Sequence, residues 1–157
     1  MSAEETLARW RAEEEAVRAR LAAAAGYARP EQIRGRTGME VFQGIFAGQL
    51  PRPPIGDTLD FVPIHIEPGL AVFQGRPQLK HYNPLGAVHG GWFATLLDSA
   101  VGCAVHSTLP AGKAYSGIEF AAGVSVSSSR GAFRPAALDA KTTCSSPLVS
   151  SVRKPIA

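Results

Sequence analysis

The sequence predicts one domain of the α+β class, and three features carry this prediction. Residues 59–67 and 70–78 both read as strands, and the turn-forming pair Pro68-Gly69 separates them. Residues 90–108 carry apolar side chains at helical spacing, over a length typical of one long helix. The chain has 157 residues, enough for one domain with a hydrophobic core and too few for two comfortable ones.

The composition is that of an ordinary folded protein, with 45% apolar and 18% charged residues. The net charge of +3 favours acidic partners only weakly, because the basic residues are spread along the chain. We therefore expect a small phosphate-bearing ligand rather than nucleic acid. The start of the chain lacks a signal-peptide pattern, and Cys103 and Cys144 suggest no disulfide framework, so we expect a cytoplasmic protein.

The first predicted element is a helix over residues 2–25. Ser2 and Glu5 match a capping box at its start. Its apolar residues form only a thin stripe: Leu7, Trp10, Val17 and Leu21. Because the other faces are charged, a peripheral, solvated helix stabilised by Glu/Arg pairs is favoured over a helix that packs on the domain or on a partner.

A second helix is predicted over residues 37–50, where apolar side chains recur at helical spacing. It ends before the proline cluster at 51–54, which is interpreted as a stiff connector. The two strands follow this connector. Apolar residues alternate in the first strand and form the centre of the second: Val62, Ile64 and Ile66, then Val72 and Phe73.

The helix over residues 90–108 is the central element. Its apolar residues form a wide face: Phe93, Leu96, Leu97, Ala100, Val101, Ala104 and Val105. Asp98 lies at the margin of this face, where a carboxylate can be partly desolvated and still reach a cavity. Asp98, His106 and the glycine pair at the start argue against a membrane span.

The apolar pattern weakens after this helix. A turn at 110–112 ends the helix, and residues 114–120 read as a further strand. Beyond Ala121 the periodicity fades, so we expect at most two weak strands, with 124–128 and 138–143 as candidates.

The residues best suited to chemistry stand around the start of the central helix. If Gly90 is near the first helical position, its N–H can donate to a carbonyl oxygen that develops negative charge. Alternatively, Gly90 and Gly91 only let the helix start pack closely on a strand. Asp98 is a candidate nucleophile or general base for water, or else an ordinary surface carboxylate.

His89 and Asn83 complete this candidate site. His89 would orient the carbonyl or the neighbouring loop, and Asn83 would hydrogen-bond that loop or the substrate. Lone residues of either kind more often cap helices or close turns. The remaining histidines, His65, His81 and His106, have no metal-ligand spacing, so we expect neither a metal nor another cofactor.

Helix geometry sets a condition on this site. Eight residues separate Gly90 from Asp98, which corresponds to a rise of about 12 Å. One chain therefore cannot bring both residues to the same carbonyl. Two copies with antiparallel central helices about a two-fold axis would place Gly90 of one opposite Asp98 of the other, in two equivalent sites.

The pattern N-x-x-G-x-x-H-G-G-x-x-x-x-L-x-D over residues 83–98, preceded by His81-Tyr82, resembles the hotdog-fold acyl-CoA thioesterases of the phenylacetate-pathway (PaaI) type. The similarity extends more loosely over residues 38–120. It implies an antiparallel sheet wrapped around the central helix, and hydrolysis of an acyl-CoA thioester to a free acid and coenzyme A. It also implies a homodimer or homotetramer, with acyl-CoA as the partner. The dispersed basic residues argue against nucleic acid as a partner, and the polar groups of the central helix argue against a membrane.

Carried over by motif position, the resemblance implies roles for individual residues. Asp98 would be the nucleophile or general base, and the Gly90 amide would polarise the thioester carbonyl. Asn83 and His89 would support and orient the site. Three residues would contact the substrate or its water: Gly91, Tyr82 and, at a position where relatives carry a hydroxyl, Ser116.

The resemblance also divides the chain, into an N-terminal helix and linker at 1–36, a hotdog core at 37–120 and a divergent segment at 121–157. The divergent segment lacks the final strands of the family, which implies an incomplete sheet. A change of reading frame or a truncation near Ala121 would account for the difference. The alternative function is therefore a non-catalytic or degenerate hotdog module that binds acyl groups or coenzyme A.

Overall fold

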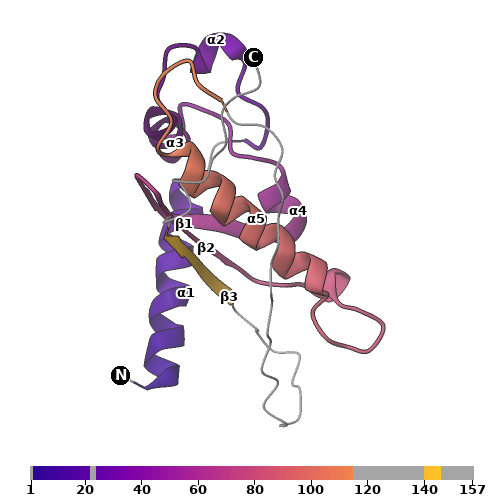
Figure 1. Cartoon of the computed structure of the whole chain (residues 1–157). Coiled ribbons are helices and arrows are strands. Elements are labelled where there is room, and N and C mark those ends of the chain that lie inside the picture. The colour runs from indigo at the N-terminus through magenta and orange to yellow at the C-terminus, as the bar shows by residue number, and fades with distance from the viewer. Residues whose placement is uncertain (1, 22–23, 115–139, 146–157) are drawn as a thin grey trace.

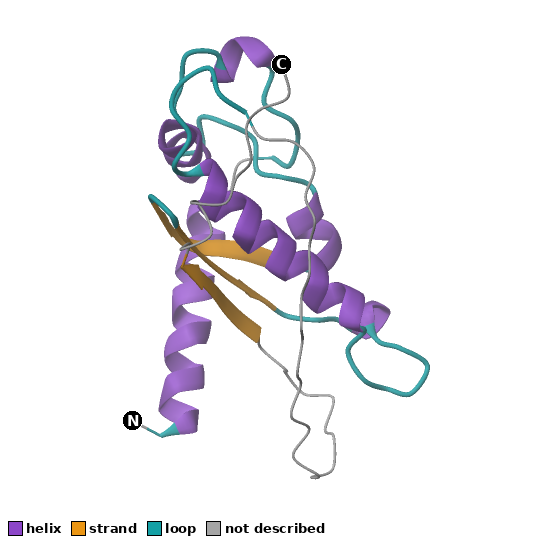
Figure 2. Ribbon diagram, viewed as in Figure 1, coloured by secondary structure: helices purple, strands orange, loops and turns teal. Residues whose placement is uncertain are grey.

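The computed structural model describes residues 2–21, 24–114 and 140–145, and these form helices on both faces of an antiparallel sheet. The sheet has the strand order β1-β2-β3, with the strands Phe61–Glu67, Leu70–Gly75 and Ala140–Ser145. Helix α1 (Ala3–Arg20) lies on one face and helix α5 (Gly90–His106) on the other (Figures 1 and 2). The predicted α+β class is confirmed.

Strands β1 and β2 form the predicted hairpin. Their register runs from Phe61 opposite Gly75 to Glu67 opposite Leu70. The turn between them is closed by Gly69, whose φ of 79° is a conformation that glycine adopts without strain. The expected strand bounds were too wide, because residue 59 ends a short helix and the second strand stops before Pro77.

Strand β3 corresponds to the weaker of the sequence predictions. It pairs antiparallel with β2, from Leu70 opposite Ser145 to Gly75 opposite Ala140. The predicted strand at 138–143 is therefore confirmed with its bounds shifted by two residues. The other expected strands, at 114–120 and 124–128, fall almost wholly outside the described residues, as does Ser116.

Helix α5 supplies the core on its side of the sheet. Buried side chains recur every four residues along α5 and pack with Ala71 and Phe73 of β2. These α5 residues are Trp92, Leu96, Ala100 and Ala104. The buried stripe is narrower than predicted, because Leu97, Val101 and Val105 are only half-buried. In the part of the chain that the structure describes, no helix is long and apolar enough to cross a membrane.

Helix α1 begins as predicted and packs differently. Ser2 Oγ accepts from the Glu5 N–H at 3.1 Å and Glu5 Oε2 accepts from the Ser2 N–H at 2.6 Å, which is the expected capping box. The helix ends at Arg20 rather than at residue 25. The interpretation as a peripheral, solvated helix is wrong, because Val17 and Leu21 are buried against Val62 of β1.

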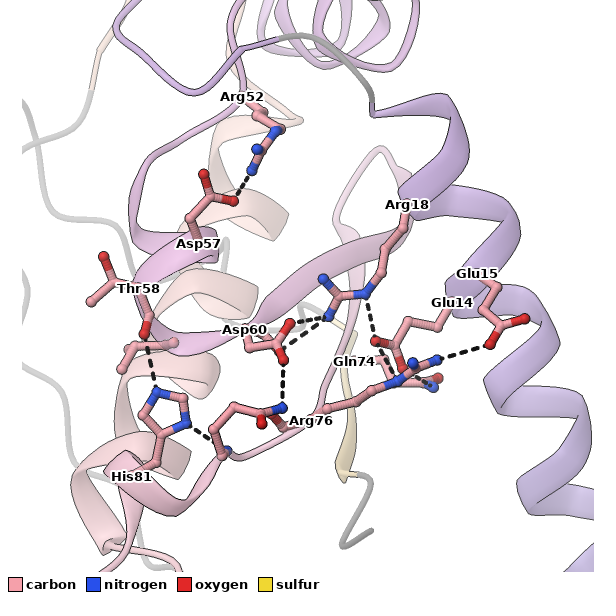
Figure 3. A network of polar contacts seen from close by, with 12 residues as sticks. Glu14, Glu15, Arg18, Arg52, Asp57, Thr58, Asp60, Gln74, Arg76 and His81 are labelled. Atoms are coloured by element: carbon pink, nitrogen blue, oxygen red, sulfur yellow. Dashed lines mark hydrogen bonds and ion pairs between the residues drawn. The ribbon is translucent and has the colours of Figure 1, made fainter.

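A buried carboxylate ties α1 to the sheet (Figure 3). The Glu14 side chain has no exposed surface and forms ion pairs with Arg18 Nε at 2.7 Å and Arg76 Nε at 3.1 Å. Its other oxygen accepts a hydrogen bond from Gln74 Nε2 at 2.9 Å. The Glu14–Arg18 pair is an i,i+4 pair of the expected kind, whereas Gln74 and Arg76 lie far away in the sequence.

Three short helices lie between α1 and β1 in the sequence. Helix α3 (Gly38–Phe46) is the predicted second helix, with Thr37 and Glu40 forming its capping box. It ends four residues earlier than expected. Two further helices, α2 (Pro30–Ile33) and α4 (Ile55–Leu59), were not predicted. The proline cluster at 51–54 connects α3 to α4, as expected, and its last residue, Pro54, is the N-cap of α4.

Candidate functional site

The start of α5 has the geometry expected for an amide donor. Gly90 is the first residue of the helix, and His89 is its N-cap, with Nδ1 accepting from the Gly91 N–H at 2.9 Å. Gly90 is exposed, and a Cβ added there would meet nothing within 4 Å among the described residues. Among the described residues, no strand packs against Gly90.

Asn83 closes the loop that precedes the helix. Its Oδ1 accepts from the backbone N–H groups of Leu85 at 3.0 Å and Ala87 at 3.1 Å. The Asn83 N–H also donates to the Ala87 carbonyl at 2.7 Å, so both its backbone and its side chain hold this loop, which projects from the domain in Figure 2. Of the two roles expected for Asn83, the structure shows hydrogen bonding to the loop.

His81 anchors the other end of the same loop. Its Nδ1 accepts from the Gln78 N–H at 2.9 Å, which leaves Nε2 to donate to the Thr58 carbonyl at 3.0 Å (Figure 3). The His81 carbonyl in turn accepts from the His89 N–H at 2.8 Å. This buried histidine thus positions the N-cap residue of α5, a role that depends on tertiary contacts and has no signature in the sequence.

Three of the residues expected in the site share one hollow of about 230 Å³ beside the helix start. They are Tyr82, His89 and Gly91, and Trp92 forms part of the same lining. The Trp92 indole N–H donates to the Leu59 carbonyl at 2.7 Å, so its ring is held in place. The start of α5 therefore opens onto a small hollow with aromatic and imidazole walls.

Asp98 borders a different space. It is exposed, and it lines an apolar cavity of about 210 Å³ enclosed by α3, α4, β1 and α5. The walls are rich in aromatic rings, supplied by Phe42, Phe46, Phe61 and Phe73. The placement of Asp98 at the edge of the apolar face, next to a cavity, agrees with the expectation from helical spacing. The aromatic walls were not identified as site residues, although the apolar spacing of residues 37–50 includes two of them, Phe42 and Phe46.

The other polar residues of this cavity are poorly suited to act as nucleophiles or bases. Burial, and after it the nearby Asp98 carboxylate, raise the pKa of Cys103 to about 12, so the thiol stays protonated at neutral pH. The Ser99 hydroxyl donates to the Thr95 carbonyl at 2.9 Å. Arg52 is paired with Asp57 (Figure 3). Asp98 is the carboxylate among the lining residues.

Gly90 and Asp98 therefore do not meet in one chain. Asp98 lines the apolar cavity, whereas Gly90 does not, and the two residues are separated along the same helix by a rise of about 12 Å. At 100° per residue, however, they belong to the same side of α5, together with Ala94 and Val101. If α5 of a second copy packed antiparallel on this side, Gly90 of one copy would lie close to Asp98 of the other.

Within the residues that the structure describes, no group of three or more His, Cys, Asp or Glu side chains is arranged to hold a metal ion. Comparison of the chain with protein-family models, with curated proteins and with solved structures gives no match.

Proposed function

We propose that the chain is a hotdog-fold acyl-CoA thioesterase whose active site is shared between two copies. The observation that carries this proposal is the position of Asp98, an exposed carboxylate on a long apolar helix at the rim of a cavity with aromatic walls. The motif over residues 83–98 adds a second line of support, through its resemblance to this family.

The cavity suits the acyl part of such a substrate. Its aromatic walls would hold an apolar group by burying its surface, at about 25 cal/mol for each Å² removed from water. The thioester carbonyl would then lie at the rim, beside Asp98. As a general base, Asp98 would take a proton from water while the water oxygen attacks the carbonyl carbon. The carbon–sulfur bond breaks, the thiolate of coenzyme A takes up the proton, and the free acid is released.

The second copy would supply the hydrogen-bond donor. The Gly90 N–H is at the positive end of α5, and the space beside it is open within the described residues. Antiparallel pairing of two α5 helices about a two-fold axis would direct this amide to the carbonyl oxygen held by the other copy. Such a donor typically contributes about 3 to 4 kcal/mol to transition-state stabilisation.

One side of α5 is suited to packing against α5 of a second copy. Small and half-buried residues, Ala94 and Val101, lie on the same side as Asp98, so two helices can approach closely there. The homodimer is therefore a condition of the proposed function, and a tetramer would repeat the same pair.

Thiol release from a panel of acyl-CoA substrates tests the proposed function. Asp98→Asn keeps the size of the side chain and removes the base, so its rate should fall at least about 100-fold. Cys103→Ala is the matched control, because it alters the same cavity and removes a thiol with no proposed role; its rate should stay within a few-fold of the wild type. Equal rates for wild type and Asp98→Asn would favour the alternative, a hotdog module that binds acyl groups or coenzyme A without turnover.

A further inference from the structure

The apolar cavity is bordered by α1 as well as by α5. Leu21, the residue that follows the last turn of α1, lines it and is 5% exposed. Leu21 also packs with Val62 of β1, and Phe46 of α3 lies against the same cluster. The N-terminal helix thus takes part in the wall of the space on which Asp98 lies.

Leu21 and Asp98 reach this cavity from opposite sides of the sheet. Along β2, Gln74 bonds to α1, while the neighbouring Phe73 packs with the core of α5; successive strand residues point to opposite faces. Among the described strands, β1 lies at an edge of the sheet, and both Phe61 and Val62 line the cavity. The cavity therefore passes around the β1 edge, from Asp98 on the α5 side to Leu21 on the α1 side.

The α1 side of the cavity is held in place. The buried Glu14 carboxylate is bound by Gln74, Arg18 and Arg76, which connects α1 to β2. Arg18 Nη2 also pairs with Asp60 at 2.7 Å, at the start of β1 (Figure 3). Gln74, Arg76 and Asp60 lie in or directly next to the two strands that border the cavity, so these contacts fix the position of Leu21 relative to its walls.

We propose that Leu21 is the end wall of the acyl cavity and limits the length of the acyl group; the proposal rests on the proposed function for the nature of this ligand. A cavity of about 150 Å³ lined by aliphatic and aromatic side chains holds one benzene molecule. The cavity here measures about 210 Å³, which suits an unbranched group of roughly eight carbons. Longer groups would meet the Leu21 side chain.

Binding of straight-chain primary alcohols, from butanol to dodecanol, tests this proposal without any turnover. A neutral head group avoids repulsion from Asp98 at the rim. Measured by calorimetry, affinity should rise about fourfold with each added methylene that is buried, and stop rising at roughly eight carbons. Leu21→Ala removes three carbons from the wall, so the chain length at which affinity stops rising should increase by about two or three carbons.

Two further variants make the test specific. Leu21→Phe fills the same position and should shorten the limiting chain length, which gives a result even if Leu21→Ala does not fold. Leu50→Ala is the matched control, because Leu50 is also a buried leucine, 2% exposed, and does not line the cavity. Its limiting chain length should equal that of the wild type.

The proposal is overturned if the limiting length is the same in wild type, Leu21→Ala and Leu21→Phe, if the wild type shows no limit up to dodecanol, or if no alcohol binds. Failure of the proposed function would show elsewhere, as thiol release that does not depend on Asp98. If the Leu21 variants change the limiting chain length but hydrolysis does not depend on Asp98, the result would support the role of Leu21 and contradict the thioesterase function.

Discussion

The carboxylate of Glu14, in the N-terminal helix, accepts a hydrogen bond from the side-chain amide of Gln74, in the middle strand, at 2.9 Å, and both side chains are fully buried. A buried carboxylate is tolerated when cations and hydrogen-bond donors surround it. Here Arg18 and Arg76 form ion pairs with the Glu14 carboxylate. This connection makes α1 part of the domain, and it brings Leu21 to the cavity that Asp98 borders.

Glu14→Ala should lower the free energy of unfolding by about 2 to 4 kcal/mol, because Gln74 loses one of its two hydrogen-bond partners and two arginines lose their buried counter-charge. The arginines are partly exposed and can turn to solvent, which keeps the loss below that of a fully buried pair. Glu15→Ala is the control: its side chain is 71% exposed and its ion pair with Arg76 is longer, at 3.6 Å. Measured by urea unfolding, the unfolding free energy of Glu15→Ala should differ from that of the wild type by less than about 0.5 kcal/mol.

Gly38→Ala should be among the most damaging small substitutions. A Cβ at Gly38 would lie 1.7 Å from the backbone oxygen of His106, so α3 and the end of α5 would have to move apart. We expect the free energy of unfolding to fall by about 3 kcal/mol or more. Gly90→Ala, where a Cβ meets nothing within 4 Å of the described residues, should change the unfolding free energy by less than about 0.5 kcal/mol. Similar losses for the two variants would contradict this packing.

The stability of the fold should decrease as the pH falls below neutrality. Burial lowers the pKa of His106 below its ordinary value of 6.5. The unfolded chain therefore takes up a proton near pH 6.5 that the folded chain resists, and stability is lost from that pH down to the folded pKa.

His106→Phe keeps a ring against Phe42, 5.4 Å away in the native structure, and removes the titrating group. Between pH 7.5 and about 5, its unfolding free energy should depend less on pH than that of the wild type. This pH range lies above the pH at which Glu40 takes up a proton, because the hydrogen bonds from Thr37 lower the pKa of Glu40 from 4.5. Parallel curves for the two proteins would show that His106 does not contribute.

Local patterns in the sequence were enough to identify the main elements. The capping residues Ser2 and Thr37 start their helices where expected, and the turn at Gly69 joins the expected strands. Helix α5 begins at Gly90 and carries Asp98 beside a cavity, also as expected. Each of these depends on residues within a few positions of one another, so their physical causes are visible in the sequence.

What was missed depends on contacts between distant residues. Two partners of Glu14, Gln74 and Arg76, lie about sixty positions away, so its burial and the packing of α1 have no local signal. His81 was expected neither to bind a metal nor to position the loop before α5, which it fixes through the Thr58 carbonyl. The aromatic walls of the cavity meet only when α3 and the hairpin fold against α5.

The central claim, a site shared between two copies, depends on two residues that one chain keeps apart. Gly90→Pro removes the N–H donor at the first helical position, where proline is tolerated, and His89 before it already has the extended backbone that proline requires. Its thiol release should fall about 100- to 1,000-fold, while Gly90→Ala, which keeps the N–H, should retain activity.

Mixing Gly90→Pro with Asp98→Asn, under conditions that exchange subunits, tests this claim most directly. Each mixed dimer would contain one site with both Gly90 and Asp98 intact and one site lacking both. Random exchange makes half of the dimers mixed, so thiol release should recover to about a quarter of the wild-type rate. A mixture that forms mixed dimers and yet stays as inactive as its two components would contradict the shared site.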